Sequence, residues 1–109
     1  IGAPLGAGSV TPGRCDLAPA ALRAVLKRIG RYDLDSRREL STGIADHGDV
    51  ALNGLDIEAA TAPIRAAVRA SVERHALTLL IGGNNAVTRP GVLGMADALG
   101  LGLEEVGLV

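Results

Sequence analysis

Two adjacent asparagines, Asn84 and Asn85, are the side chains in this sequence whose position most strongly indicates a binding site. They follow the apolar and β-branched run of residues 77–81 and then the glycine pair Gly82 and Gly83. A run without polar alternation is typical of a strand buried on both faces, as in a parallel sheet covered by helices. Glycines allow a sharp turn, and ligands of open α/β sheets bind at the carboxyl ends of the strands. We therefore predict a site at Asn84 and Asn85.

Three segments of the chain together resemble the N-terminal part of the arginase, agmatinase and formimidoglutamase (ureohydrolase) superfamily, and formimidoglutamase-like members most of all. They are Gly2-Ala3-Pro4-Leu5, Asp46-His47-Gly48-Asp49-Val50 and Ile81-Gly82-Gly83-Asn84-Asn85-Ala86-Val87. The resemblance implies a three-layer α/β/α fold with a parallel sheet, of which these residues form the N-terminal part. It also implies a parent enzyme that hydrolyses a C–N bond of a small amidino or formimino substrate.

The resemblance assigns a metal position as well. In the superfamily, a Gly-Gly-Asp-His-Ser turn supplies a histidine as the first ligand of a two-manganese centre, and Asn85 stands at that histidine here. Asn84 stands at the preceding aspartate. A neutral amide oxygen brings no charge to a hard cation, so Asn85 is a weak candidate metal ligand, and both asparagines are candidates for substrate binding. The later Asp-Ala-His-x-Asp and Asp-x-Asp motifs that complete the centre are absent from these 109 residues. We expect the segment alone to be inactive and assign it no catalytic residue.

Arg14 is a further candidate for substrate binding, because a loop of this kind lies near the substrate mouth in the superfamily. Its guanidinium group suits a substrate carboxylate, although an ordinary surface arginine is the competing interpretation. The aspartates Asp46 and Asp49 flank a glycine and are interpreted as hydrogen-bonding their own turn rather than a metal ion. His75, at a predicted helix end, is interpreted as a helix-dipole cation or an ordinary surface residue.

Other classes of protein remain open. The glycine turn and the following helix start also suit a nucleotide- or phosphate-binding α/β module. A basic face on the first predicted helix suits a non-catalytic interaction or assembly domain. A one-domain Rossmann oxidoreductase ranks lower, because the fingerprint glycines and the ribose-binding acid are not where that fold needs them.

The hydrophobic periodicity predicts helices near residues 17–29, 61–75 and 89–99, and parallel strands near residues 1–4, 43–46, 77–82 and 105–109. The first helix should be capped by Asp16, with Pro19 in its first turn, and the third by Thr88, with Gly100 at its end. The second should be capped by Thr61, because Pro63 argues against an earlier start. Met95 should fill the core, and Arg23 should lie on a solvated basic face. The first helix carries an apolar stripe that should be buried, made of Leu22, Val25, Leu26 and Ile29.

The composition narrows the partners and the compartment. Eleven basic and twelve acidic residues give a net charge of -1, which does not favour nucleic acid or an anionic membrane. Cys15 is the sole cysteine and favours a reducing compartment, so we expect a cytoplasmic protein, with a homo-oligomeric parent. The residues at both ends of the sequence have the pattern of the interior of a strand. We therefore expect residues 1–109 to be one segment of a single arginase-like α/β domain, truncated at both ends.

Overall fold

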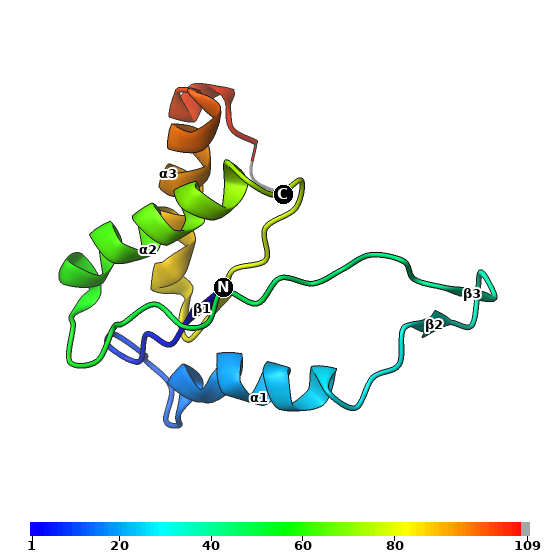
Figure 1. Ribbon diagram of the computed structural model, residues 1–109. Coiled ribbons are helices and arrows are strands. Elements are labelled where there is room, and N and C mark those ends of the chain that lie inside the picture. The colour runs from blue at the N-terminus through cyan, green and yellow to red at the C-terminus, as the bar shows by residue number, and fades with distance from the viewer. Residues whose placement is uncertain (108–109) are drawn as a thin grey trace.

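A computed structural model of the chain describes residues 1–107. This part contains α1 (Ala18–Leu26), α2 (Ile57–Val72) and α3 (Thr88–Leu99), with the short strands β1 (Gly2–Ala3), β2 (Tyr32–Asp33), β3 (Arg38–Glu39) and β4 (Ile81–Gly82). Three 3-10 turns are also present, η1 (Cys15–Leu17), η2 (Asn85–Val87) and η3 (Leu103–Glu105). In Figure 1, β1 lies between α1 and the α2–α3 pair, while the β2–β3 hairpin extends away from both.

The first strand is the centre of the small sheet. β1 pairs in parallel with β4, so that Gly2 faces Ile81, and Gly2 also forms a parallel bridge to Asp49. The parallel orientation of these two strands was predicted and is confirmed. An α/β fold is therefore present, in the form of helices around a small parallel sheet.

The predicted strands are longer than those observed. Residues 43–46 form no strand, because the Asp46 carboxylate accepts a hydrogen bond from the Gly48 N–H at 2.9 Å and turns the chain before it reaches β1. Of residues 77–82 only Ile81–Gly82 is a strand, because ladder hydrogen bonds need a partner and β1 is two residues long. Leu77 and Leu79 remain 77% and 61% exposed. At the other end, Leu103–Glu105 is a 3-10 turn rather than a strand, and residues 108 and 109 lie outside the described residues.

Helix α1 is shorter and less buried than predicted. Pro19 lies in its first turn as expected, but Asp16 is not the cap, because it lies in η1 and its carboxylate pairs with Arg14. The helix ends at Leu26 rather than near residue 29. The predicted buried stripe is exposed, at 36% to 61% for its four members, because α1 packs on only a few residues of β1 and β4.

Helix α2 begins before the position that we predicted. The Asp56 carboxylate accepts a hydrogen bond from the Ala59 N–H at 2.8 Å and caps a helix that starts at Ile57, with Pro63 inside it. The predicted cap, Thr61, instead donates its hydroxyl to the Ile57 carbonyl at 3.1 Å. A proline in a helix interior costs about 3 kcal/mol. Here the cap and the burial of Ile64 and Ala60 on the core offset that cost.

Replacing Asp56 by alanine is expected to lower the free energy of unfolding by about 1 kcal/mol, because the N-terminus of α2 loses its side-chain acceptor. Urea unfolding followed by far-UV circular dichroism measures the change. Asp56→Asn keeps an acceptor and should be nearly neutral, and Thr61→Ala should cost less than Asp56→Ala. A larger loss from Thr61→Ala would mean that the helix starts where the sequence alone suggested.

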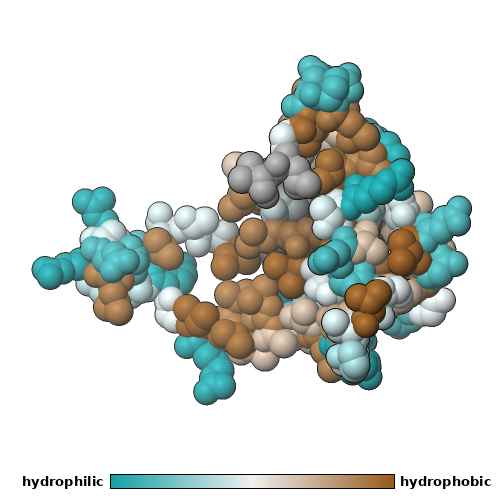
Figure 2. Space-filling view, turned by 180° about the vertical axis from the view of Figure 1, so that it is seen from behind, coloured by the Kyte–Doolittle hydropathy of each residue, from teal (hydrophilic) through white to brown (hydrophobic). Residues whose placement is uncertain are grey.

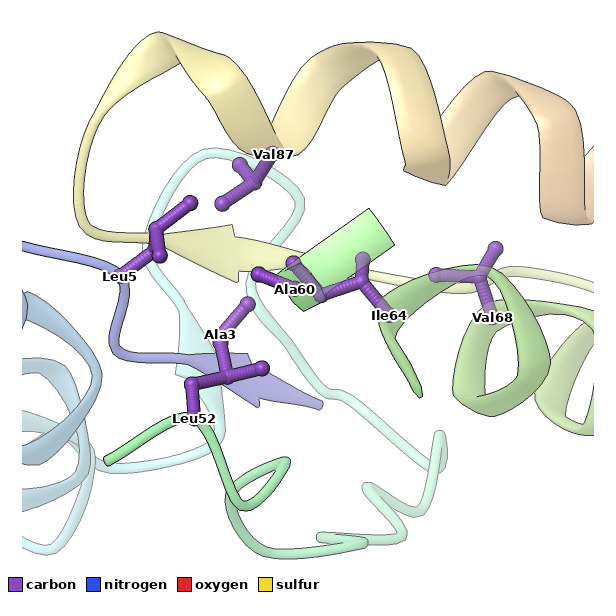
Figure 3. Packing of buried hydrophobic residues seen from close by; sticks show 7 residues of the cluster. All are labelled: Ala3, Leu5, Leu52, Ala60, Ile64, Val68 and Val87. Carbon is purple, nitrogen blue, oxygen red and sulfur yellow. The ribbon is translucent and has the colours of Figure 1, made fainter. Parts of the chain in front are cut away.

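The core lies where α2 and α3 meet β1. Its buried members are Ala3, Leu5, Leu52, Ala60, Ile64, Val68 and Val87 (Figure 3). Met95 packs against this cluster, as predicted. Helix α3 ends at Gly100 in the left-handed region, with φ of 66°, also as predicted, but Thr88 is not a cap, since α3 continues directly from η2. Arg65 on α2 and Asp97 on α3 form an ion pair across the helix contact.

Candidate functional site

The glycine–asparagine turn lies at the carboxyl ends of β1 and β4. The Gly83 N–H donates to the Ala3 carbonyl at 3.0 Å, and the Asn84 N–H donates to the Leu5 carbonyl at 3.2 Å. The chain that leaves β1 therefore runs beside the turn that leaves β4. Two segments about eighty residues apart in sequence meet at this edge of the sheet, where ligands of open α/β sheets bind.

Both polar groups of the Asn84 side chain are hydrogen-bonded within the protein. Its Nδ2 donates to the Ala7 carbonyl at 2.5 Å, and its Oδ1 accepts from the Ala86 N–H at 2.8 Å. The second bond caps η2, and the first fixes the loop after β1. Asn84 thus links the loop after β1 to η2. That its amide binds substrate stays a prediction, and such binding would require a hydrogen bond to the substrate to replace one of these two bonds.

Asn85 is placed differently. It is the first residue of η2, and its side chain is exposed at the same edge of the sheet. Its position suits contact with a ligand in solution, whereas the neighbouring Val87 is buried in the core. Its assignment as a substrate or metal ligand stays a prediction.

Arg14 lies near the same loop, but its guanidinium is engaged. Its Nε and Nη2 donate to the two carboxylate oxygens of Asp16 at 2.9 Å and 2.7 Å. The neighbouring Cys15 thiol lies 3.8 Å from the Leu5 carbonyl, which brings this segment beside the loop that Asn84 holds. The segment that contains Arg14 and the turn that contains Asn84 therefore both contact the loop that follows β1.

The Arg14–Asp16 pair shifts both ionisation equilibria. Its hydrogen bond raises the pKa of the Arg14 guanidinium and lowers the pKa of the Asp16 carboxyl. Because Asp16 stays ionised, a substrate carboxylate must displace it before it reaches Arg14. The Arg14 side chain is 70% exposed, so such an exchange needs little movement of the backbone.

The residues at this edge do not form a complete manganese site. Within residues 1–107, no group of three or more His, Cys, Asp or Glu side chains is arranged to hold a metal ion. Asn85 offers only a neutral amide oxygen, and Asn84 is already bonded on both sides. A hard divalent cation prefers several charged oxygens. No reaction step through manganese can therefore be derived from this chain.

A second polar cluster joins α1 to the turn before α2, and sequence reasoning missed it. Arg23 donates Nε to one Asp46 oxygen at 2.7 Å and Nη1 to Asp49 at 2.5 Å. We had placed Arg23 on a solvated basic face. The hydrogen bond from the Gly48 N–H to Asp46 confirms the prediction that this carboxylate shapes its own turn. Nothing in the local sequence indicates the arginine, because the partners are 23 and 26 residues apart.

Stability should fall when Asp46 is protonated. The hydrogen bond from Arg23, followed by that from the Gly48 N–H, lowers the pKa of Asp46 from 3.8 to about 2. A lowered folded-state pKa adds stability above the unfolded pKa and loses it as the pH falls through the folded value. Asp46→Asn is thus expected to melt below the unchanged chain at pH 6, and the two melting temperatures should converge between about pH 4 and pH 2.

Thermal melts by circular dichroism at a series of pH values test this prediction. Asp35→Asn removes the same charge from the exposed β2–β3 turn and serves as the control, with little change of melting temperature expected. A constant gap between Asp46→Asn and the unchanged chain down to pH 2 would contradict the role given to the Arg23 pair.

An apolar cavity lies away from the asparagines. It has a volume of about 420 Å³ and opens between α1, the loop before Asp49 and the chain that leads into β4. Leu22, Leu26, Leu77 and Leu79 supply much of its wall, together with His47 and His75. Figure 2 shows the apolar surface that runs between α1 and the α2–α3 pair. The cavity therefore meets β4 on the side where the strand begins, and the turn at Asn84 lies where it ends.

Helices around a parallel strand pair, with polar residues at the carboxyl ends of the strands, define an α/β protein of the kind that binds ligands at that edge. A family model described as "Arginase family" matches residues 1–109, so the chain belongs to the arginase family. Members of this family are generally hydrolases and depend on manganese. Neither the curated proteins nor the solved structures contain a match to this chain. Within residues 1–107, no helix has the length and apolar character needed to span a membrane.

Proposed function

We propose that this chain is the N-terminal segment of a formimidoglutamase-like ureohydrolase, which hydrolyses a C–N bond of a formimino or amidino substrate. The observation that carries the proposal is the turn at Gly83, Asn84 and Asn85, held against the chain leaving β1 at the carboxyl edge of a parallel strand pair. Membership of the arginase family supports it. The segment by itself is inactive, because it lacks a set of metal ligands within the described residues.

The rest of the active site comes from other parts of the parent protein. Additional parallel strands beside β1 and β4 complete a three-layer α/β/α domain, and their carboxyl ends supply the carboxylates and histidines for manganese. The exposed apolar stripe of α1 and the exposed leucines 77 and 79 support this proposal, since a larger sheet would cover them. The parent is a cytoplasmic homo-oligomer.

Each residue of the site then has a distinct task. Asn84 fixes the loop after β1 through its two hydrogen bonds and keeps the edge open for substrate. Asn85 directs its exposed amide towards the bound substrate or one metal ion. Arg14 exchanges Asp16 for a carboxylate of the substrate, which suits formiminoglutamate better than agmatine, because agmatine carries no carboxylate.

The mass of the protein in its source organism is the first test. A mass near 11.0 kDa by denaturing mass spectrometry would mean that the protein is only this segment. The proposed activity would then describe the enzyme from which the segment descends, and not the segment itself. A mass of roughly 25–35 kDa, the size of a complete single α/β domain, would identify the parent enzyme.

The parent is then assayed with manganese on formiminoglutamate, agmatine and arginine. We expect hydrolysis of formiminoglutamate to be the fastest, and Arg14→Gln to raise KM for it more than for agmatine. Lys27→Gln, directly after the end of α1, is the matched control and should change neither value. No hydrolysis of any of the three, with tight binding of a nucleotide in the absence of metal, would replace the proposal with the anion-binding alternative.

A further inference from the structure

The two histidines of the chain meet each other although they are 28 residues apart. The Nε2 atoms of His47 and His75 lie 3.0 Å apart, and the two ring centroids lie 5.0 Å apart at an interplanar angle of 61°. The nitrogens are thus closer together than the ring bodies, so the Nε2 edges face each other. The contact joins the loop before Asp49 to the segment that follows α2.

Both imidazoles line the apolar cavity and can be reached from solvent. His47 is exposed and His75 is half-buried. They stand beside the Arg23 cluster, in which one guanidinium is paired with the carboxylates of Asp46 and Asp49. That cluster carries one net negative charge, which the N-terminal ammonium of Ile1 offsets, since it lines the same cavity and helps to lower the pKa of Asp46. A cation site here therefore depends on the two imidazole nitrogens and not on the surrounding charge. Thr42 and Thr78 line the same cavity, and the Thr78 hydroxyl is hydrogen-bonded to that of Ser71 at 2.9 Å.

We propose that His47 and His75 bind a late first-row divalent cation, Ni²⁺ or Cu²⁺, through their Nε2 atoms. A metal ion about 2.0–2.1 Å from each of two nitrogens that are 3.0 Å apart subtends an angle of about 94°. This angle matches neighbouring positions in a square-planar or octahedral shell, which Ni²⁺ and Cu²⁺ adopt, and is smaller than the tetrahedral angle that structural zinc requires. Imidazole nitrogen is also a donor that both ions prefer.

The site is separate from the manganese centre of the proposed function. His75 precedes the chain leading into β4, whereas Asn84 and Asn85 follow that strand, so the two lie at opposite ends of residues 76–83. Water completes the coordination shell. A bound ion links the loop at His47 to the segment that follows α2 and stabilises the fold by mass action.

Titration of the 109-residue chain with Ni²⁺ by isothermal calorimetry tests the site, and Ni²⁺ is preferred to Cu²⁺ because it does not oxidise the Cys15 thiol. The chain has two histidines, so no other imidazole can compensate for a loss. We expect one Ni²⁺ per chain, and His47→Gln and His75→Gln should each weaken binding at least about tenfold, because the second nitrogen acts at high effective concentration. Cys15→Ser is the matched control and should bind as the unchanged chain does.

A second measurement needs no variant and covers the case in which a histidine substitution disturbs folding. Paramagnetic Ni²⁺ should broaden the ring proton signals of His47 and His75 together, at less than one equivalent, while Mn²⁺ at the same concentration should bind more weakly, as the order of divalent affinities requires. Broadening of one ring alone, or equal binding by both single variants and the unchanged chain, would overturn the shared site. Neither result depends on whether the parent is a hydrolase.

Discussion

Alanine in place of Gly94 is expected to separate α3 from α2 and to lower the free energy of unfolding by about 3 kcal/mol. A Cβ atom at this position would lie 2.4 Å from the Arg65 carbonyl oxygen and 3.0 Å from the Val68 Cβ. The nearest atom belongs to the backbone of α2, so a side-chain rotation cannot relieve the contact. The two helices would have to move apart, and Val68 and Ile64 would lose packing in the core. Urea unfolding followed by circular dichroism measures the loss.

Gly91→Ala is the control for this prediction, since it lies in the same helix one turn earlier. A Cβ atom there would meet the end of the Leu80 side chain at 2.8 Å, and a flexible side chain can move away. Alanine favours a helix interior over glycine by about 1 kcal/mol, so Gly91→Ala should be neutral or stabilising. Equal stability of the Gly94→Ala and Gly91→Ala proteins would contradict the close approach of α2 and α3.

Alanine in place of Gly83 is expected to open the candidate site itself. Its Cβ atom would lie 2.2 Å from the Leu5 carbonyl oxygen and 2.8 Å from the Leu5 carbonyl carbon, and both are backbone atoms. To avoid them the turn must leave the chain after β1, which breaks the hydrogen bonds from Gly83 to Ala3 and from Asn84 to Leu5. Two net hydrogen bonds at about 1 kcal/mol each, together with the steric cost, amount to about 3 kcal/mol.

Hydrogen exchange observed by NMR shows, residue by residue, which amides lose their hydrogen bonds in the Gly83→Ala protein. The amide of Asn84 should lose protection in the Gly83→Ala protein, while amides within α2 lose much less. Gly43→Ala is the control, because a Cβ atom there meets nothing within 4 Å and its backbone is not in the left-handed region. Unchanged protection of the Asn84 amide would show that the turn does not depend on its hydrogen bond to the Leu5 carbonyl.

Sequence reasoning succeeded where the local residues alone determine the structure of a short segment. Residues 77–81 followed by Gly82 and Gly83 predicted a strand and a turn here, of which the turn and a two-residue strand are present. The resemblance that this segment carries led to the arginase family. Pro19 and Gly100 marked a helix start and a helix end correctly. The same local rules failed for α2, where Pro63 argued for a later start. Burial of Ala60 and Ile64 outweighed the proline, and burial depends on where the rest of the chain lies.

The contacts that sequence reasoning missed are all distant in sequence. Arg23 meets Asp46, and His47 meets His75, only because the fold brings their elements together. Single residues on a helix face or in a loop give no sign of such partners. The apolar stripe of α1 was predicted to be buried because its periodicity is that of a core helix, but periodicity cannot say whether a covering element is present.

The exposed run that leads into β4 has a consequence for how the chain behaves at high concentration. Residues 77–81 have strong β propensity and contain neither a charge nor a proline, and in the described part of the chain only Ile81 of these residues lies in a strand. Short segments of this kind stack in register into cross-β fibrils with dry, interdigitated interfaces. The N-terminal amine of Ile1, which donates to the Leu79 carbonyl at 3.0 Å, occupies one backbone group of this run. A strand that pairs with this run would thus protect the protein from amyloid formation.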